Sequence, residues 1–238
     1  MPIDDYHGET FVAFVDISGF KALMKNREDA YKALSRFYQI GYDVLGSETN
    51  RINPNRVDGI FISDCGVLFS RCNGQDIENP RNQVIALGHL LEIIESISKR
   101  MIADNFMLTA SISFGQFDYH ERANFVGIEK NLMLGNAYLE AYLDNEVGKP
   151  KLEPGQCRIV NHNQDNNLFT LVEASDAPPF NRVVKNQRDS KHLYFYWMVP
   201  SENEIDNFTQ NYKDAYNQKY SGMLKALRMF ANNNDVIR

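Results

Sequence analysis

The sequence is poor in cysteine and tryptophan. Its three cysteines, Cys65, Cys72 and Cys157, form no CxxC pair and leave one thiol over in any disulfide scheme. This usage argues against a secreted disulfide framework and against a cysteine zinc site, and it is typical of a reducing compartment. We therefore expect a cytoplasmic protein.

Two further absences narrow the function. The formal net charge is −6, so the chain has no excess of the basic residues that broad nucleic-acid binding requires. No apolar run approaches the length of a membrane span, and the polar N-terminus MPIDDYHGET does not resemble a signal peptide. We expect neither nucleic acid nor a membrane as a partner. A small phosphorylated ligand remains open, because a metal ion can supply positive charge locally.

The composition that is present is that of a globular protein. Hydrophobic residues make up 43% and charged residues 24% of the chain, a balance that can bury a substantial core. A length of 238 residues suits one generous domain. We expect a single domain over 1–238, with its core at about 10–200 and a C-terminal helix at about 203–232.

Hydrophobic periodicity predicts alternating strands and helices. Strands are expected at 11–16, 59–62, 67–69, 108–117, 157–160 and 193–199. Helices are expected at about 21–45, 80–101, 131–147 and 203–232. The polar segment 173–190 is expected to be a surface loop. The order β-α-β-β-α-β with later additions predicts an α+β, ferredoxin-like fold, an antiparallel sheet flanked by helices.

Two acidic residues stand at strand ends that this topology brings together. Asp16 ends the first strand, and Asp64 lies in the hairpin between the second and third. The first and third strands are neighbours in such a sheet, and two adjacent carboxylates repel unless a cation lies between them. Magnesium or manganese suits the position, because hard cations prefer oxygen ligands. Alternatively, each acid is an N-cap or turn residue.

The residues after Asp16 add donors for a phosphorylated ligand. The carbonyl of Ile17 can bind a metal ion, and the following Ser18, Gly19 and Phe20 lead into a predicted helix. A helix N-terminus offers free N–H groups to an anion, and glycine lets the backbone approach it closely. This loop therefore predicts metal and triphosphate binding side by side.

At these residues the sequence resembles the class III nucleotidyl cyclases, the family of most adenylate and guanylate cyclases. Segment 14–20, FVDISGF, is similar to the family motif F-x-D-I-x-G-F, and segment 62–65, ISDC, resembles its second metal motif, L-G-D-C or L-G-D-G. Segment 110–115 and the triplet GNA at 135–137 resemble further family segments. The resemblance covers roughly 11–145.

The resemblance implies a class III cyclase domain, a phosphorus–oxygen lyase that converts a ribonucleoside triphosphate to a 3′,5′-cyclic monophosphate and diphosphate. Asp16, Asp64 and the carbonyl of Ile17 would hold two Mn²⁺ or Mg²⁺ ions while the ribose 3′-hydroxyl attacks the α-phosphorus. The nucleotide-binding positions that follow from the motif are Phe14, Ile17, Ser18, Gly19 and Phe20. The family's sites form between two domains, which implies a head-to-tail homodimer.

Two pairs of positions depart from the family pattern. Leu139 and Leu143 stand where the family helix has its Asn and its transition-state Arg. Ile60 and, approximately, Leu132 stand where purine cyclases read the base with polar side chains. Phe14 could line a smaller base pocket or be a core aromatic. Candidate replacements for the lost arginine are Arg122, Lys130, or a basic residue near Arg188 and Lys191.

These departures, with the short chain and the retained acids, resemble the bacterial pyrimidine cyclases of Pycsar antiphage defence. The resemblance implies that UTP or CTP is converted to cyclic UMP or cyclic CMP, which activates a separate effector protein. The alternative is a catalytically degenerate cyclase-like domain that binds a nucleotide or a partner. A diguanylate cyclase is disfavoured because the chain contains no G-G-D/E-E-F stretch, and a purely structural α+β domain remains the simplest alternative.

Overall fold

A computed structural model describes residues 3–72, 77, 79–125, 128–161, 167–186, 189–200, 204 and 207. For 121–125, 128–131, 167 and 186 it describes the backbone alone. The predicted C-terminal helix at about 203–232 lies, apart from two residues, outside the described part of the chain.

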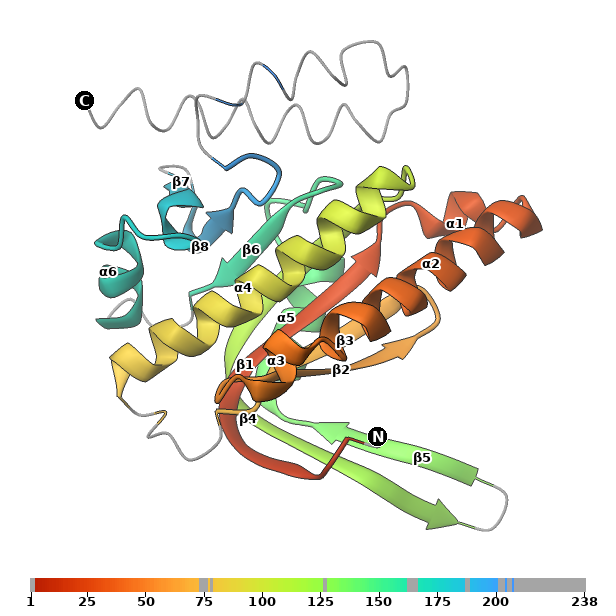
Figure 1. Cartoon of the computed structure of the whole chain (residues 1–238), viewed down its shortest axis with the longest axis horizontal. Helices are drawn as coiled ribbons and strands as arrows, with labels where there is room; N and C mark the ends of the chain where they lie inside the picture. Colours follow the sequence, from red (N-terminus) through yellow and green to blue (C-terminus); the bar gives the residue numbers. More distant parts are fainter. Residues whose placement is uncertain are drawn as a thin grey trace.

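The described chain is built around an eight-stranded sheet (Figure 1). The strands are β1 (Tyr6–Ile17), β2 (Val57–Ile62), β3 (Cys65–Ser70), β4 (Leu108–Phe125), β5 (Ile128–Leu134), β6 (Cys157–Val160), β7 (Val183–Asn186) and β8 (Asp189–Phe195). Their order is β2-β3-β1-β4-β6-β8-β7, with β5 paired to β4. All neighbours are antiparallel except β4 and β6. The first and third strands are therefore adjacent, as the ferredoxin-like order predicts.

Two long helices, α2 and α4, cover one face of the sheet, and α5 lies behind the other (Figure 1). The helices are α1 (Phe20–Leu23), α2 (Arg27–Leu45), α3 (Glu48–Ile52), α4 (Pro80–Ala103), α5 (Asn136–Val147), α6 (Asn167–Glu173) and the 3₁₀ turn η1 (Phe180–Arg182). The side chains of Asn26 and Asn79 accept backbone N–H bonds at the starts of α2 and α4. These caps set where the two helices begin.

Strand β1 has side chains in both layers of the core. Its odd-numbered residues from Phe11 to Ile17 belong to the large cluster beneath α2 and α4. Val12 and Phe14 belong to a smaller cluster with Ala137 and Ala141 of α5. Because side chains alternate along a strand, Asp16 lies on the α5 side.

The predicted α+β, ferredoxin-like architecture is confirmed, but two segments differ from their predictions. The expected helix at 131–147 is a strand, β5, followed by the shorter α5. Gly135 separates them with φ 131°, and a Cβ there would lie 2.2 Å from the carbonyl oxygen of Gln116. This close contact with β4 ends the strand and requires glycine.

The expected surface loop at 173–190 is also wrong. It contains the end of α6, η1, strand β7 and the start of β8. Asp189 and Phe180 of this segment are buried. Its polar composition misled the prediction, because two of its charged side chains, Arg182 and Asp189, are buried and paired.

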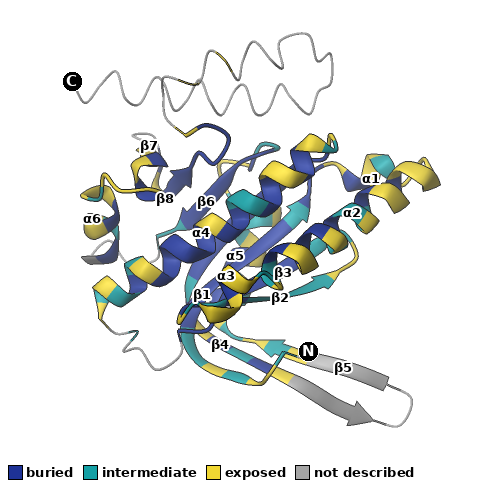
Figure 2. Ribbon diagram, viewed as in Figure 1, coloured by how far each residue is buried: buried dark blue, intermediate teal, exposed yellow. Residues whose placement is uncertain are grey.

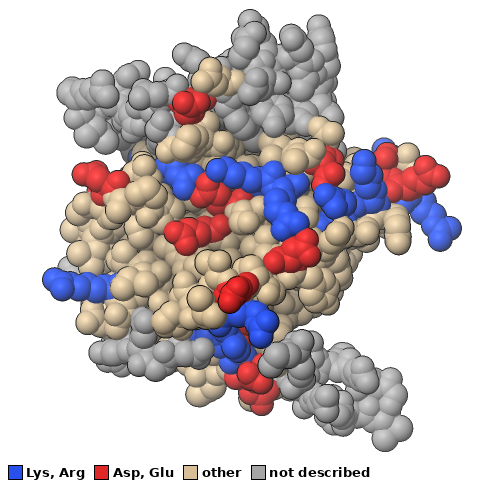
Figure 3. Space-filling model, in the orientation of Figure 1, with Lys and Arg blue, Asp and Glu red and all other residues tan. Residues whose placement is uncertain are grey.

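The outer face of the two long helices is an ordinary solvated surface. Figure 2 shows buried residues concentrated in the sheet and along the inner side of α4. Figure 3 shows acidic and basic side chains interspersed over this face, with no field of one sign among the described residues. None of the described helices is long and apolar enough to cross a membrane.

Candidate active site

The two predicted acids lie at the same edge of the sheet. Asp16 is the penultimate residue of β1, and its register partner in β3 is Cys65. Asp64 immediately precedes that cysteine in the β2–β3 turn, and its carbonyl accepts a 2.9 Å hydrogen bond from the N–H of Ile17. This backbone bond ties the carboxylate-bearing turn to the end of β1.

Negative charges crowd together at this edge, where two ionisable groups have raised pKa values. Burial, followed by repulsion from Asp64 and Glu146, raises the pKa of Asp16 to about 7. Burial and the same three carboxylates raise the pKa of the Cys65 thiol to about 11. Glu146 comes from the last turn of α5, and sequence reasoning missed it, because nothing in its local pattern places that turn beside β1.

The donor set fits a divalent cation that is shared with a phosphorylated ligand. Among the residues that the structure describes, no basic side chain forms an ion pair with Asp16, Asp64 or Glu146, and no group of three His, Cys, Asp or Glu side chains is arranged as a metal cage. Magnesium is commonly held by one or two carboxylates, with water and substrate phosphates completing its shell. Two carboxylates and the Ile17 carbonyl match that pattern.

The hairpin that presents Asp64 is strained at one residue. Ser63 has φ 56°, a left-handed conformation. A positive φ at the first central residue of a two-residue hairpin is the pattern that glycine favours. The resembling family motif has glycine at this position, the residue that adopts a positive φ most readily.

The loop after Asp16 offers fewer free amides than predicted. The N–H of Ile17 is bonded to Asp64 and that of Ser18 donates to the carbonyl of Met107 at 2.8 Å. Gly19 is exposed with φ 74°, and within the described chain neither its N–H nor that of Phe20 donates to a backbone carbonyl. The amides of these last two residues are therefore the ones that could meet a phosphate.

The side chains of the predicted nucleotide-binding residues lie mostly inside. Phe14, Ile17, Ser18 and Phe20 are buried, and the Ser18 hydroxyl has no hydrogen-bond partner. The Phe14 ring packs edge-on against Tyr142 of α5 with ring centroids 5.2 Å apart. Their nucleotide-binding roles stay predictions. Of the two roles considered for Phe14, the structure shows it as a core aromatic.

The departures from the family pattern occupy an exposed face. Leu139 and Leu143 of α5 are 51% and 44% exposed, and Leu132 of β5 is 45% exposed. Ile60 is half-buried beside the α5-side core cluster. These apolar side chains face solvent or that cluster, so none supplies the polar group that purine recognition would use.

The candidate replacement for the family arginine stays open. The side chains of Arg122 and Lys130 and the whole of Arg188 lie outside the described residues. Lys191 is exposed on β8, which β4 and β6 separate from β1.

Solved structures share this fold. The adenylyl cyclase CyaB from P. aeruginosa aligns with a TM-score of 0.51 at 13% identity, over 81% of this chain and 95% of that one. The monomeric guanylyl cyclase domain of the RhoGC fusion protein from the aquatic fungus Blastocladiella emersonii aligns with a TM-score of 0.50 at 12% identity, over 82% and 98%. No protein-family model and no curated protein sequence matches the chain. The chain therefore has the fold of a class III cyclase domain.

The strain at Ser63 makes a testable prediction. Replacement Ser63→Gly should stabilise the protein by about 1 kcal/mol, because glycine adopts a positive φ without the penalty of a Cβ. The free energy of unfolding from urea denaturation measures the change. The control is Ser63→Ala, which keeps the Cβ and should give no gain. Equal stability of the glycine and alanine variants would contradict the strain.

The raised pKa of Asp16 predicts that the free energy of unfolding of the metal-free protein, measured with a chelator present, depends on pH. As pH rises from about 4 through about 7, the folded chain must give up a proton that it binds more tightly than the unfolded chain, so this group lowers stability over that window. Asp16→Asn removes the cost and should be more stable than the natural protein by about 1 kcal/mol near pH 8, allowing for solvent screening.

The comparison is made by urea denaturation at both ends of the window. The gain should nearly vanish near pH 4, because there Asp16 keeps its proton in the folded chain and is close to its ordinary pKa in the unfolded chain. Asp176→Asn, a change at an exposed carboxylate, serves as the control and should show no pH-dependent gain. A loss of stability in Asp16→Asn near pH 8 would show that the carboxylates are not crowded.

Proposed function

We propose that this chain, which has the fold of a class III cyclase domain, is a metal-dependent nucleotidyl cyclase that forms a 3′,5′-cyclic monophosphate and diphosphate. The observation that supports this most is the pair Asp16 and Asp64 on adjacent strand ends. Their charges repel in a half-buried edge, and no described basic side chain neutralises them. A site that holds like charges together at this cost suits divalent cations.

The protein's own residues have limited roles in this reaction. Asp16, Asp64 and the Ile17 carbonyl would hold two Mn²⁺ or Mg²⁺ ions, which, when bound, activate the 3′-hydroxyl and stabilise charge on the phosphates. The amides of Gly19 and Phe20 would donate to phosphate oxygens. The hydrogen bond from the Ile17 N–H to the Asp64 carbonyl keeps the two acids in register. In this reaction most of the catalysis would come from positioning and electrostatics.

The proposed substrate is a pyrimidine nucleotide, UTP or CTP. Ile60 and Leu132 offer no hydrogen-bonding group at the positions where the purine cyclases of the family read the base. The proposed product, cyclic UMP or cyclic CMP, would act as a second messenger for a separate effector protein in antiphage defence. This role rests on the resemblance to the Pycsar cyclases.

A degenerate domain that binds a nucleotide without converting it is the second candidate. It is favoured by Leu139 and Leu143, which leave α5 without the polar side chains that the family brings to ribose and phosphate. It is opposed by the intact pair of acids, whose mutual repulsion would serve no purpose in a domain without metal chemistry.

The head-to-tail homodimer is part of the same proposal. Helix α5 and strand β5 carry a set of exposed apolar side chains, here called the apolar patch: Leu132, Leu134, Leu139, Leu143 and Val147. Exposed apolar patches of this kind mark association sites. A second copy would cover the patch and complete each site with contacts from the partner subunit.

The activity prediction uses each of the four ribonucleoside triphosphates with Mn²⁺ and mass spectrometry of the products. UTP or CTP should give a cyclic monophosphate. Asp16→Asn and Asp64→Asn should each lower the rate by about 100-fold or more, because each removes a charged metal ligand. Asp176→Asn should retain the natural rate. Cyclic AMP or cyclic GMP as the main product would contradict the pyrimidine assignment, and nucleotide binding without product would favour the degenerate domain.

The dimer prediction uses light scattering on a sizing column. Leu143→Glu introduces a charge into the apolar patch on α5 and should convert the dimer to a monomer, because an interface loses stability when a charge is buried without a partner. Tyr31→Glu is the matched control, since Tyr31 is 73% exposed on α2, on the other side of the sheet. A monomeric natural protein, or equal dimerisation of both variants, would contradict the assigned interface.

A further inference from the structure

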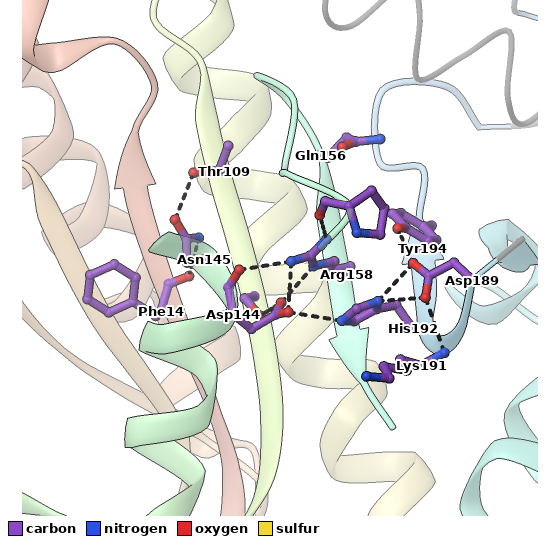
Figure 4. Close-up of polar contacts among 12 residues, drawn as sticks. Phe14, Thr109, Asp144, Asn145, Gln156, Arg158, Asp189, Lys191, His192 and Tyr194 are labelled. Carbon is purple, nitrogen blue, oxygen red and sulfur yellow. Dashed lines mark hydrogen bonds and ion pairs between the residues drawn. The ribbon is translucent and has the colours of Figure 1, made fainter. Parts of the chain in front are cut away.

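A cluster of charged side chains lies buried where α5 meets β6 and β8, and we call it the Asp144 cluster (Figure 4). Its ionisable members are Asp144 of α5, Arg158 of β6, and Asp189 and His192 of β8. Their side chains are 9%, 0%, 5% and 4% exposed. Charged groups so fully removed from water are rare unless they are paired.

Asp144 is the centre of this cluster. Arg158 donates to both of its carboxylate oxygens, through Nε at 2.6 Å and Nη2 at 2.7 Å, and also to its main-chain carbonyl at 2.8 Å. Ser111 donates to the same carboxylate. Burial alone would raise the pKa of Asp144, but the bonds from His192, Arg158 and Ser111 outweigh it and lower the pKa to about 2.

His192 joins Asp144 to a second carboxylate. Its Nε2 lies 2.9 Å from Asp144, and its Nδ1 lies 2.8 Å from Asp189, which also accepts a bond from the hydroxyl of Tyr194. The His192 ring therefore bridges the two carboxylates. The Asp144 cluster is thus fully bonded across α5, β4, β6 and β8.

Such a cluster is not the cheapest way to stabilise a core. Replacing a buried ion pair with apolar side chains of similar size is often neutral or stabilising. Unlike apolar contacts, the hydrogen bonds of buried ionic groups fix the positions of their partners. In this protein those hydrogen bonds hold the last turn of α5. Arg158 bonds the carbonyl of Asp144 at that turn and the carbonyl of Pro150 just beyond it, so the C-terminal end of the helix is held at defined points.

Asn145, the residue after Asp144, links the last turn of α5 to β1. The side chain of Asn145 donates to the carbonyl of Phe14 at 3.4 Å and accepts from the hydroxyl of Thr109 at 3.3 Å (Figure 4). Phe14 lies two residues before Asp16 on the same strand. Glu146 follows Asn145 directly in the same turn of α5. The held turn of α5 and the acidic edge are therefore neighbours.

We infer that the Asp144 cluster is a positioning device for the metal site, in which Arg158 and Asp144 fix the last turn of α5 and Asn145 fixes that turn against β1 beside Asp16. Arg158 and Asn145 are positioning residues and touch neither metal nor nucleotide. The inference rests on the proposed metal site but not on the reaction, since metal binding can be measured without turnover.

A matched control exists elsewhere in the chain. Arg182 pairs with Glu95 of α4 at 2.7 Å and is also buried, with 8% of its side chain exposed. Among the described residues, the hydrogen bonds of this pair reach Lys99 and the carbonyl of Val199 but neither α5 nor β1. The Arg182 guanidinium packs over the Phe195 ring. Arg182→Gln therefore removes the same chemical group from a comparable environment, without the link to the acidic edge.

The experiment titrates the full-length natural protein and the variants Arg158→Gln, Asn145→Leu and Arg182→Gln with Mn²⁺ alone. Bound metal is read from the loss of the electron paramagnetic resonance signal of free Mn²⁺, at a temperature where each protein is folded. We expect Arg158→Gln and Asn145→Leu to weaken Mn²⁺ binding by about fivefold or more, and Arg182→Gln to change it by less than about twofold.

The sign of the Arg158→Gln effect separates positioning from simple electrostatics. Removing a positive charge near the site would strengthen cation binding if only long-range charge mattered, whereas loss of positioning weakens it. Asn145→Leu changes no charge and keeps the Asp144 cluster intact, so it tests the link to β1 even if Arg158→Gln fails to fold. Mn²⁺ binding to both variants within twofold of natural would overturn the inference, as would equal weakening in Arg182→Gln.

Failure of the proposed reaction gives a different pattern. If the natural protein binds Mn²⁺, Asn145→Leu weakens that binding and no nucleotide yields a cyclic product, the positioning inference stands and the cyclase proposal falls. If the natural protein binds Mn²⁺ no better than Asp16→Asn does, the metal site is absent and the positioning inference falls with it.

Discussion

The register of β1 against β3 and β4 is the constraint on which the rest of the structure depends. It places Asp16 opposite Cys65, which brings the β2–β3 turn and Asp64 to the same edge. The bond from the Ile17 N–H to the Asp64 carbonyl closes that edge. Because the strand has core side chains on both faces, a shift by one residue would exchange the two layers and turn Asp16 into the apolar cluster under the long helices. The hydrophobic core and the candidate active site are therefore specified by the same pairing.

Helix α5 connects the remaining features of the site. Its small inner residues Ala137 and Ala141 allow it to pack close to the sheet over Phe14, and its last turn is held by the Asp144 cluster. On its outer face, Leu139 and Leu143 are exposed at the positions where the resembling family carries polar ribose and phosphate contacts. Helix α5 thus packs beside the acidic edge of its own subunit and, in the proposed dimer, against the neighbouring subunit. A change in its inclination would alter both.

The sequence predicted the fold and the acidic pair because both depend on local signals. Apolar runs ending in Asp16 and surrounding Asp64 are visible in the order of residues, and the β-α-β-β-α-β order then makes the strands neighbours. The helix expected at 131–147 was wrong because apolar residues of β5 continue the spacing of α5, and only the contact of Gly135 with the backbone of β4 separates them. Glu146 could not be predicted, since it approaches Asp16 only once α5 packs against β1. The Asp144 cluster could not be predicted either, since its members meet only once β6 and β8 are packed.

The two-sided burial of β1 also bears on how such a domain can diverge. An insertion or deletion of one residue within this strand would displace every following side chain to the opposite layer, so β1 tolerates substitutions better than such changes of length. The far end of the β4–β5 hairpin is different, because beyond Tyr119 strand β4 pairs with β5 alone. Pairs of residues could be added to or removed from both strands there without disturbing the sheet. Length variation between distant members of this fold should therefore accumulate in that hairpin, while the strand that carries Asp16 keeps a constant length.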